Sequence, residues 1–162
     1  MSDAKSHDFI WRMISEIGTC MMVTQNGNTP RARPMRGIAR PEQNTVWFFT
    51  DVKAHAADEI VRHPRGCLAY ADPTNQSFVS VSGQLSVVQD RKMIAELWTE
   101  GADAYFPAGK EDPDVQLLKF VAEAAEYWDS PSNPIVLAIQ FLQAKITGTR
   151  PQLGVHDSVR LP

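Results

Sequence analysis

The alternation of apolar and polar positions along the chain predicts a mainly β protein. The clearest alternation covers residues 79–87, where the apolar positions are Val79, Val81, Leu85 and Val87. An apolar residue at every second position is typical of a strand with one buried face. Residues 45–50 are apolar at consecutive positions, which predicts a strand buried on both faces. Asn26-Gly27 predicts a tight hairpin between the strands at 20–24 and 31–39.

Two further strands are expected, at 67–71 and at 115–121, although the second pattern also fits a helix. Capping residues and helical spacing predict four short helices and a long loop between the strands. The helices are expected from Ser6 to Ile17, from Ala54 to Arg62, after the cap Asp90 and over 135–147, and the loop over 101–113. Six antiparallel strands with helices between them indicate an α+β fold, mainly β with α decorations, built as a small barrel. We expect one domain over residues 1–150, followed by a loose tail at 151–162.

Bulk composition narrows the class of protein further. The 162 residues are 43% hydrophobic and carry a formal net charge of -3, which gives no overall attraction to nucleic acid or anionic membranes. The N-terminus lacks the apolar core of a signal peptide, and the longest apolar stretch, 135–142, is too short to cross a bilayer. These features predict a soluble cytoplasmic protein. Cys20 and Cys67 are expected to be buried small hydrophobes rather than a disulfide.

Arginines cluster within ten residues of the second strand. They are Arg31, Arg33, Arg36 and Arg40. Most such clusters are solvated strand faces, but Arg33 is followed by Pro34, and a proline marks an edge or a bulge where backbone groups are free to meet a ligand. A guanidinium fork at such a break suits bidentate phosphate recognition. The acidic overall balance argues against nucleic acid as the source of that phosphate.

A second candidate site follows the strand at 45–50. Its aromatic residues are expected to lie in the core, but Thr50 stands where the strand gives way to a helix. A helix N-terminus offers free N–H groups to a phosphate, and Lys53 and His55 lie in that turn.

Other chemistries have weak support in the sequence. No GxSxG elbow surrounds a serine, no HExxH or paired histidine spacing predicts a metal site, and no glycine-rich phosphate loop is present.

Some of the aromatic residues late in the sequence are expected to lie at a subunit interface, which would place a cleft between two chains. They are Trp98, Tyr105, Tyr127 and Trp128.

Seven stretches, taken together and in order, give the sequence a family resemblance. They are RARPM (31–35), WFFTD (47–51), LAYADP (68–73), FVSVSG (78–83), ELW (96–98), YFPAGKEDPDVQLL (105–118) and AEYWDSP (125–131). In these the chain resembles the pyridoxamine 5'-phosphate oxidase-like FMN-binding split barrels, in particular the general stress protein 26 branch. The resemblance implies a homodimer of six-stranded antiparallel split β-barrels with FMN at the subunit interface and FAD as the other possible flavin.

The resemblance also implies roles for individual residues. Arg33, Pro34 and Met35 would line the flavin, and Phe49 and Thr50 would contact its ring and its ribityl-phosphate. Phe78 stands where the oxidases of the family have a flavin-contacting glutamine, and Trp128 would approach the ligand from the partner chain.

One departure from the family pattern bears on the phosphate. The family usually places a lysine at the start of the helix after the WFFTD-like strand, and here the pair is His55-Ala56. Only His55, the helix N-terminus and Lys53 are left to compensate, which predicts weakened FMN binding or a different flavin. By the same reasoning, Ala56→Lys is expected to tighten FMN.

The resemblance therefore implies a flavin-binding protein, in first place an oxidoreductase of unknown substrate. The alternatives are a stress protein that holds flavin without catalysis, and a split barrel that holds another ligand such as FAD, heme or a deazaflavin. No residue is identified as a general acid or base, and whether the protein is an enzyme stays open. Oxidation of pyridoxamine phosphate does not carry over, because no matching set of substrate residues is found.

Overall fold

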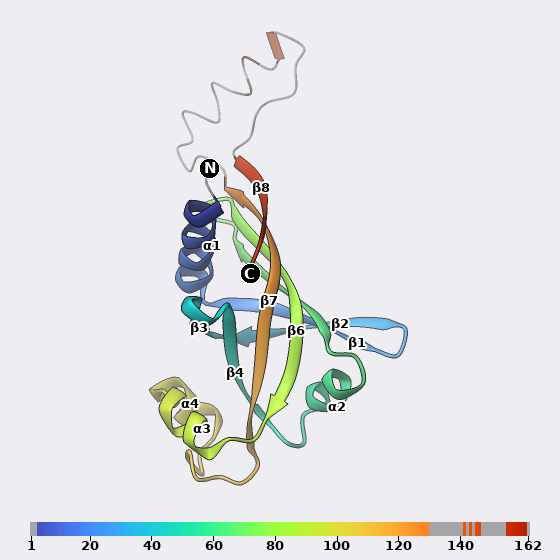
Figure 1. The fold of residues 1–162 in the computed structure, drawn as a ribbon, viewed down its shortest axis with the longest axis vertical. Coiled ribbons are helices and arrows are strands. Elements are labelled where there is room, and N and C mark those ends of the chain that lie inside the picture. The colour runs from blue at the N-terminus through green and yellow to red at the C-terminus, as the bar shows by residue number, and fades with distance from the viewer. Residues whose placement is uncertain (1–2, 130–140, 142, 144, 147–154, 162) are drawn as a thin grey trace.

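The fold is an antiparallel barrel with helices on its outside and at its lower end (Figure 1). The computed structural model describes residues 3–129, 141, 143, 145, 146 and 155–161. The elements in chain order are α1 (Asp3–Ile17), β1 (Thr19–Asn26), β2 (Thr29–Arg36), β3 (Ile38–Arg40), the 3-10 turn Pro41–Gln43, β4 (Thr45–Asp51), α2 (His55–Arg62), β5 (Arg65–Asp72), β6 (Ser77–Val88), α3 (Arg91–Leu97), α4 (Glu100–Tyr105), β7 (Val115–Asp129) and β8 (Val155–Arg160).

The strands pair in the order β2-β1-β5-β6-β7-β4-β3, and all their pairings are antiparallel. The two ends of this order, β2 and β3, are consecutive in the chain and are separated by Gly37 alone, so the sheet closes on itself. A Cβ at Gly37 would lie 2.5 Å from Val46 Cγ1, which explains the glycine at this bend. Because β2 and β3 are halves of one bent segment, the barrel wall has the six strands that the sequence predicts.

The interior of the barrel is filled by the apolar faces that the sequence pattern marks. Val79, Val81 and Leu85 are buried there together with residues of the other strands, and α1 closes one side with Ile10 and Ile14. The consecutive apolar residues of β4 divide between two clusters, with Phe48 inside the barrel and Trp47 outside it. The prediction that β4 is buried on both faces is confirmed.

Several local expectations are confirmed. The hairpin expected at Asn26-Gly27 joins β1 to β2, with Gly27 and Asn28 as its two turn residues, and Gly27 at the first of these positions has a positive φ of 61°. The Asp90 side chain caps α3 by accepting hydrogen bonds from the Lys92 and Met93 amides. Cys20 and Cys67 are both free, but only Cys20 is buried as expected, and Cys67 is half-buried. Burial raises the pKa of the Cys20 thiol to about 11, which keeps it protonated and inert.

Other expectations are wrong. Ser6 does not cap the first helix, because α1 includes it and its side chain is buried. The start of the expected loop at 101–113 is helical, since Thr99 caps α4. The strand expected at 115–121 continues to Asp129 as β7 and pairs with β6 along nearly its whole length.

The C-terminal end of the chain also differs from expectation. Residues 151–162 were expected to form a loose tail, but Val155–Arg160 form β8, which adds to the edge of the upper part of β7 (Figure 1). Val159 and Leu161 are buried in the barrel core, and this burial holds the segment in place. Most of the helix expected at 135–147 lies outside the described residues. Among the helices described, none is long and apolar enough to span a membrane.

Candidate functional site

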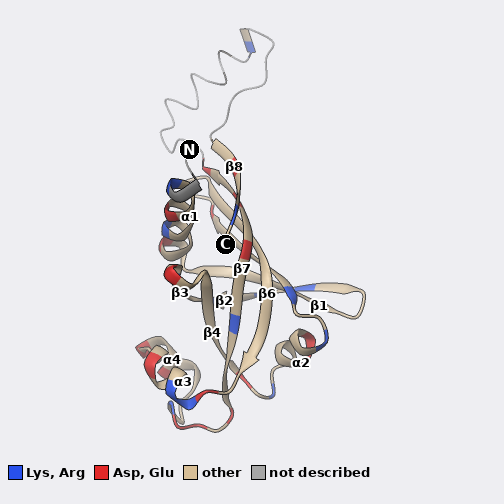
Figure 2. Ribbon diagram, viewed as in Figure 1, with Lys and Arg blue, Asp and Glu red and all other residues tan. Residues whose placement is uncertain are grey.

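Arg33 lies on β2 and is one of four side chains that meet between β1, β2 and α2. Its Nη2 donates to the Thr24 hydroxyl at 2.8 Å and to the Glu59 carboxylate. Arg31 approaches the other carboxylate oxygen of Glu59, with 3.1 Å between its Nη1 and Oε1. Figure 2 shows basic positions on the β1–β2 pair where it passes α2. We call Thr24, Arg31, Arg33 and Glu59 the arginine–glutamate cluster.

Glu59 is the centre of this cluster. On α2 it shares the buried face with Ala56 and Ile60, which pack into the barrel core, and its side chain is only 5% exposed. Burial by itself would raise the pKa of this carboxyl group. The hydrogen bonds from Thr24 and Arg33 and the charges of both arginines outweigh that effect and lower the pKa below its ordinary value. Glu59 is therefore ionised at neutral pH.

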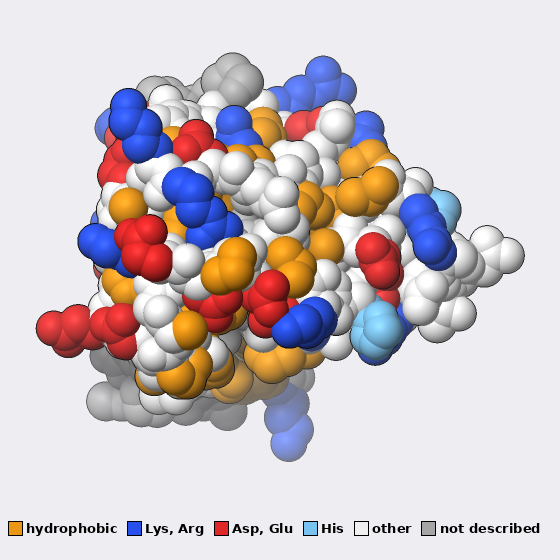
Figure 3. All heavy atoms as spheres, turned by 90° about the horizontal axis from the view of Figure 1, so that it is seen from below, with side chains coloured by type: hydrophobic (Ala, Val, Ile, Leu, Met, Phe, Trp, Pro, Cys, Tyr) orange, Lys and Arg blue, Asp and Glu red, His pale blue; other side chains and the backbone are white. Residues whose placement is uncertain are grey.

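A surface cavity of about 230 Å³ lies against the cluster. Arg31, Glu59 and His55 line it together with the Asn26-Gly27 turn and other residues of α2. His55 is the first residue of α2, and the preceding Ala54 makes no side-chain cap, so the opening amides of the helix are not satisfied by a capping side chain. Figure 3 shows histidine, basic and acidic side chains together on the side of the molecule where α2 lies. The cavity is polar and bears charges of both signs.

Thr50 and Phe49 lie at the lower end of β4, apart from the cluster. Thr50 is buried on the barrel side, where it stands opposite Gln116 of β7. Phe49 faces outward and packs edge-on against Trp98, with 5.2 Å between the ring centroids, and also against Phe106. Both neighbours of the Phe49 ring are thus apolar groups of the α3–α4 region.

Lys53 follows β4 and pairs with the end of a loop rather than with the cluster. Its Nζ lies 2.6 Å from Asp114 Oδ2, and the hydrogen bond to that carboxylate raises the pKa of the lysine. The Lys53 side chain is 77% exposed, so water screens this pair strongly.

Phe78 and Trp128 stand side by side at the upper end of the barrel, since they are directly paired between β6 and β7. Trp128 is 38% exposed, and the ring of His156 on β8 stacks on it at 4.9 Å with 9° between the planes. Along β7, Trp128 lies twelve residues from Gln116, the partner of Thr50. At about 3.3 Å per residue this is roughly 40 Å along the strand.

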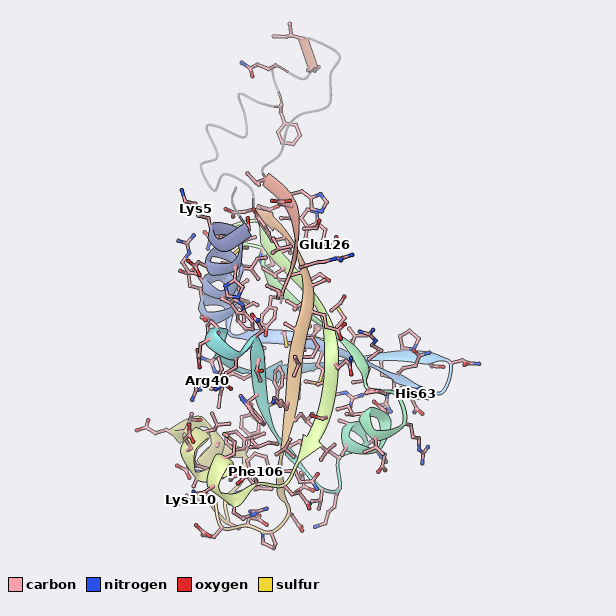
Figure 4. The ribbon with its side chains drawn as sticks, viewed as in Figure 1. Lys5, Arg40, His63, Phe106, Lys110 and Glu126 are labelled. Atoms are coloured by element: carbon pink, nitrogen blue, oxygen red, sulfur yellow. The ribbon has the colours of Figure 1, made fainter. Side chains whose placement is uncertain are left out.

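The same separation is visible in Figure 4, where Glu126 near the top of β7 and Phe106 beside α3 and α4 lie at opposite ends of the molecule. The sequence-predicted residues thus fall into separate groups within one chain. Of these residues, Arg33 and His55 belong to or border the arginine–glutamate cluster, whereas Phe49 and Thr50 end β4 and Phe78 pairs with Trp128. Pro34 is exposed and Met35 half-buried on β2, next to Arg33.

Sequence reasoning missed Glu59, Thr24 and His156. The helical spacing of Glu59 with Ala56 and Ile60 was a signal for Glu59, because it puts a carboxylate on the apolar face of an amphipathic helix. A buried carboxylate requires cationic or hydrogen-bonding partners, and the arginine-rich strand was the nearest source of them. His156 had no such signal, since β8 itself was not expected.

Across the described part of the chain no three acidic, histidine or cysteine side chains gather as metal ligands. A second cavity of about 330 Å³ lies beyond Thr24 on the outer face of β1, β5 and β6, with Arg65, Cys67 and Ser82 among its lining residues. What the arginine–glutamate cluster offers chemically is paired guanidinium groups that suit recognition of an anion.

The fold and the site together define a small antiparallel split barrel with an arginine pair held on its wall beside a short helix. The chain belongs to the pyridoxamine 5'-phosphate oxidase like family, whose model matches residues 5–152.

Solved structures agree with this assignment. A candidate general stress protein 26 from Jannaschia sp. CCS1 superposes with a TM-score of 0.77 at 23% identity, covering 99% of this chain and 100% of that one, which shows the shared fold. The general stress FMN/FAD binding protein from Xanthomonas citri is 27% identical, with a TM-score of 0.67 over 76% of this chain and 87% of that one. Protein bli-3 of Neurospora crassa is 25% identical over 109 residues, 62% of this chain, which spans about half (52%) of that relative.

Proposed function

We propose that this protein binds a flavin, FMN in first place and FAD as the alternative, and uses it as an oxidoreductase of still undefined substrate. The observation that carries the proposal is the arginine pair on β2, oriented by a buried carboxylate beside a polar cavity. The name of the Xanthomonas citri relative, a general stress FMN/FAD binding protein, supports the same ligand class. We expect the protein to act in the cytoplasm.

The residues present suit the phosphate end of a flavin. Arg33 spends only Nη2 on Thr24 and Glu59, so its Nη1 and Nε atoms have no partner among the described residues. Each of these two groups can donate one charge-assisted hydrogen bond to a phosphate oxygen. The uncapped start of α2 at His55 adds free amides and a positive dipole nearby. Pro34 and Met35 continue β2 from Arg33 and would line the flavin.

The residues expected around the flavin would come from two copies of the chain. Thr50 and Trp128 are roughly 40 Å apart along one barrel wall, farther than an FMN molecule extends. If both groups contact one flavin, they come from different chains. We therefore propose a homodimer in which Arg33, Phe49 and Thr50 of one chain face Trp128 of the other, with Phe78 at the margin of the same site and Lys53 and His55 adding charge.

A bound flavin would supply the electron-transfer chemistry, and the chain's own residues would bind it, orient it and limit its contact with water. The second candidate is a flavin-binding stress protein without catalytic turnover. It is favoured by the pairing of the buried Glu59 carboxylate with Thr24, Arg31 and Arg33, which engages this carboxylate in hydrogen bonds rather than leaving it free to transfer a proton. Fast and complete reduction of the bound flavin by NADH or NADPH would support the oxidoreductase, and its failure with both donors would support the second candidate.

The deciding experiment is a visible absorbance spectrum of the purified protein, followed by titration with FMN, FAD and riboflavin. A flavin spectrum or saturable binding supports the proposal, and no affinity for any flavin contradicts it. A Soret band would indicate heme instead. Arg33→Ala should weaken FMN binding by about one to two decades, the value of a lost charge-assisted hydrogen bond, without unfolding the protein. Arg36→Ala is the matched control, because Arg36 is exposed on the same strand and forms no ion pair with the described residues.

A further inference from the structure

Glu59 of α2 is a buried carboxylate that packs against the barrel wall and has three hydrogen-bond donors around it. Thr24 donates to Oε2 at 2.6 Å, Arg33 donates to the same oxygen, and Arg31 donates to Oε1 at 3.1 Å. The three donors come from two strands, β1 and β2, while the carboxylate comes from α2. One side chain therefore fixes the relative positions of three elements.

The Glu59 carboxylate is held in place against an incoming anion by its hydrogen bonds and by the packing of α2. Ile60 and Ala56 of the same helix are buried in the barrel core, and Thr24 is itself buried. Displacing the carboxylate would break its hydrogen bonds with Thr24, Arg31 and Arg33 and would leave the buried Thr24 hydroxyl without this acceptor. A ligand phosphate must therefore approach the arginines from their outer side, where the Arg31 side chain is 49% exposed and that of Arg33 is 21% exposed.

The pairing also orders the guanidinium groups. An arginine on a strand has several rotatable bonds, and immobilising it on binding a ligand costs free energy. Arg33 is already immobilised by its two Nη2 contacts, and its Nη1 and Nε N–H groups have no partner among the described residues. Since one carboxylate serves two guanidinium groups, the cluster keeps a net charge of about +1, which still attracts an anion.

We propose that Glu59 is a positioning residue that holds Arg31 and Arg33 ready for the phosphate of the bound flavin. This inference rests on the proposed function and adds to it a residue that contacts no ligand atom itself. It predicts that Glu59 raises the affinity for flavins that carry a phosphate, through Arg33, and does not change the affinity for a flavin that lacks one.

The test compares FMN with riboflavin, which has the same ring and no phosphate. In Glu59→Gln the amide cannot accept from all three donors, and FMN affinity should fall about fivefold to tenfold while riboflavin affinity changes less than about twofold. In the Arg33→Ala background the same substitution should change FMN affinity less than about twofold, because the group that it acts through is gone. Asp58→Asn is the matched control. It removes one negative charge beside the same cavity, from an exposed residue that touches neither arginine.

Three outcomes would overturn the inference. An equal loss of FMN and riboflavin affinity would mean that Glu59 only maintains the fold. Tighter FMN binding in Glu59→Gln would mean that the carboxylate competes with the phosphate. Equal effects of Glu59→Gln and Asp58→Asn would mean that charge alone matters.

A variant that fails to fold does not end the test. Glu59→Asp keeps the charge on a shorter side chain and should lower FMN affinity about threefold with riboflavin unchanged. Unchanged FMN affinity in this variant would contradict the inference.

If the wild-type protein binds no flavin, the proposed function itself fails. If it binds FMN through Arg33 but Glu59→Gln behaves as wild type, only the role of Glu59 fails.

Discussion

The two helical insertions of the barrel are held to it in different ways. On one side α2 packs Ala56 and Ile60 into the core but places the charged Glu59 beside them. At the lower end α3 and α4 rest on Ile94 and Leu97, with the aromatic rings of Trp98 and Phe106 gathered around Phe49 (Figure 1). We call this second set, together with Val115 and Leu117, the aromatic cluster.

We propose that this difference separates residues that stabilise the fold from residues that recognise phosphate. The aromatic cluster stabilises the α3–α4 region by burying apolar area, and its buried members carry no charged group that selects a ligand. The arginine–glutamate cluster contributes less apolar burial but keeps two cationic groups ordered at a half-exposed surface. An ordered cation at such a surface recognises an anion with little loss of conformational freedom. We therefore expect substitutions in the two regions to separate, with losses of stability in one and of phosphate affinity in the other.

The largest effect is expected where a charge enters the apolar part of α2. Ala56 stands at the family's lysine position, but its side chain is buried in the barrel core. Ala56→Lys should lower the free energy of unfolding by about 3–5 kcal/mol, because burying an ammonium group is costly and Glu59, the carboxylate on the same face of α2, is already paired with Arg31 and Arg33. His55→Lys is the control: this position is exposed and borders the cavity, so stability should not change and FMN should bind more tightly. Urea denaturation and FMN titration measure both quantities. If Ala56→Lys is stable and tightens FMN, the assignment of position 56 to the core is wrong.

A cavity in the aromatic cluster should affect stability alone. Ile94 is fully buried, and Ile94→Ala should cost about 2–4 kcal/mol in the free energy of unfolding, from lost burial and the cavity left behind. Tyr105→Ala, at a neighbouring but 84% exposed side chain, should change stability by less than about 0.5 kcal/mol. FMN affinity of the folded Ile94→Ala protein should match wild type. A large loss of FMN affinity there would mean that the packing around Ile94 sets the position of Phe49 for its proposed contact with the flavin ring.

Acid should weaken the arginine–glutamate cluster and leave the aromatic cluster unchanged. Because the pKa of Glu59 is lower in the folded protein than its ordinary value of 4.5, the ionised carboxylate stabilises the folded state above that pH. This stabilisation is lost as pH falls below 4.5 through the folded-state pKa. At pH 7 the free energy of unfolding of the wild type should exceed that of Glu59→Gln by about 2 kcal/mol. This is less than for a fully buried ion pair, because Arg31 is half exposed. Urea titrations from pH 7 to pH 3 should show this difference shrinking only below about pH 4.5. Parallel curves over the whole range would contradict the assignment.

The comparison also shows what the sequence can predict. The barrel wall follows from local patterns: alternation marked β6, the consecutive apolar residues marked β4, and Asn26-Gly27 fixed the β1–β2 hairpin. These signals act over a few residues, and neighbours in the chain become neighbours in the sheet. The strand β8 was not predicted, because its apolar–polar pattern is short. It is stabilised by pairing with β7 and by the burial of Val159 and Leu161, and no local pattern encodes these contacts.

The candidate site, like the fold, was predictable from the sequence only where the signal is local. Arg33 was singled out for its position before Pro34, and the structure places it in a polar cluster beside α2. Glu59 was missed because its partners lie 26 and 28 residues away, so the pairing depends on how α2 docks against the barrel. The flavin contacts of Arg33, Phe49, Thr50, Phe78 and Trp128 stay predictions, and the distance between the ends of β7 explains why no single chain brings all of them together.

The smallest effect is expected at Lys53, which the sequence suggests as a substitute for the family lysine. Its pair with Asp114 is exposed, and water and salt screen it, so Lys53→Gln should leave the thermal unfolding midpoint unchanged. If the phosphate lies at the arginine–glutamate cluster, FMN affinity should change less than about twofold, and 0.5 M NaCl should remove even that difference, since the Debye length then falls to a few ångströms. The loss of FMN affinity in Arg33→Ala, measured in the same experiment, shows how large the effect of losing a phosphate contact is. A loss in Lys53→Gln as large as that of Arg33→Ala would move the phosphate to the turn between β4 and α2. The arginine–glutamate cluster would then be a structural tie for α2, and both helical insertions would serve stability alone.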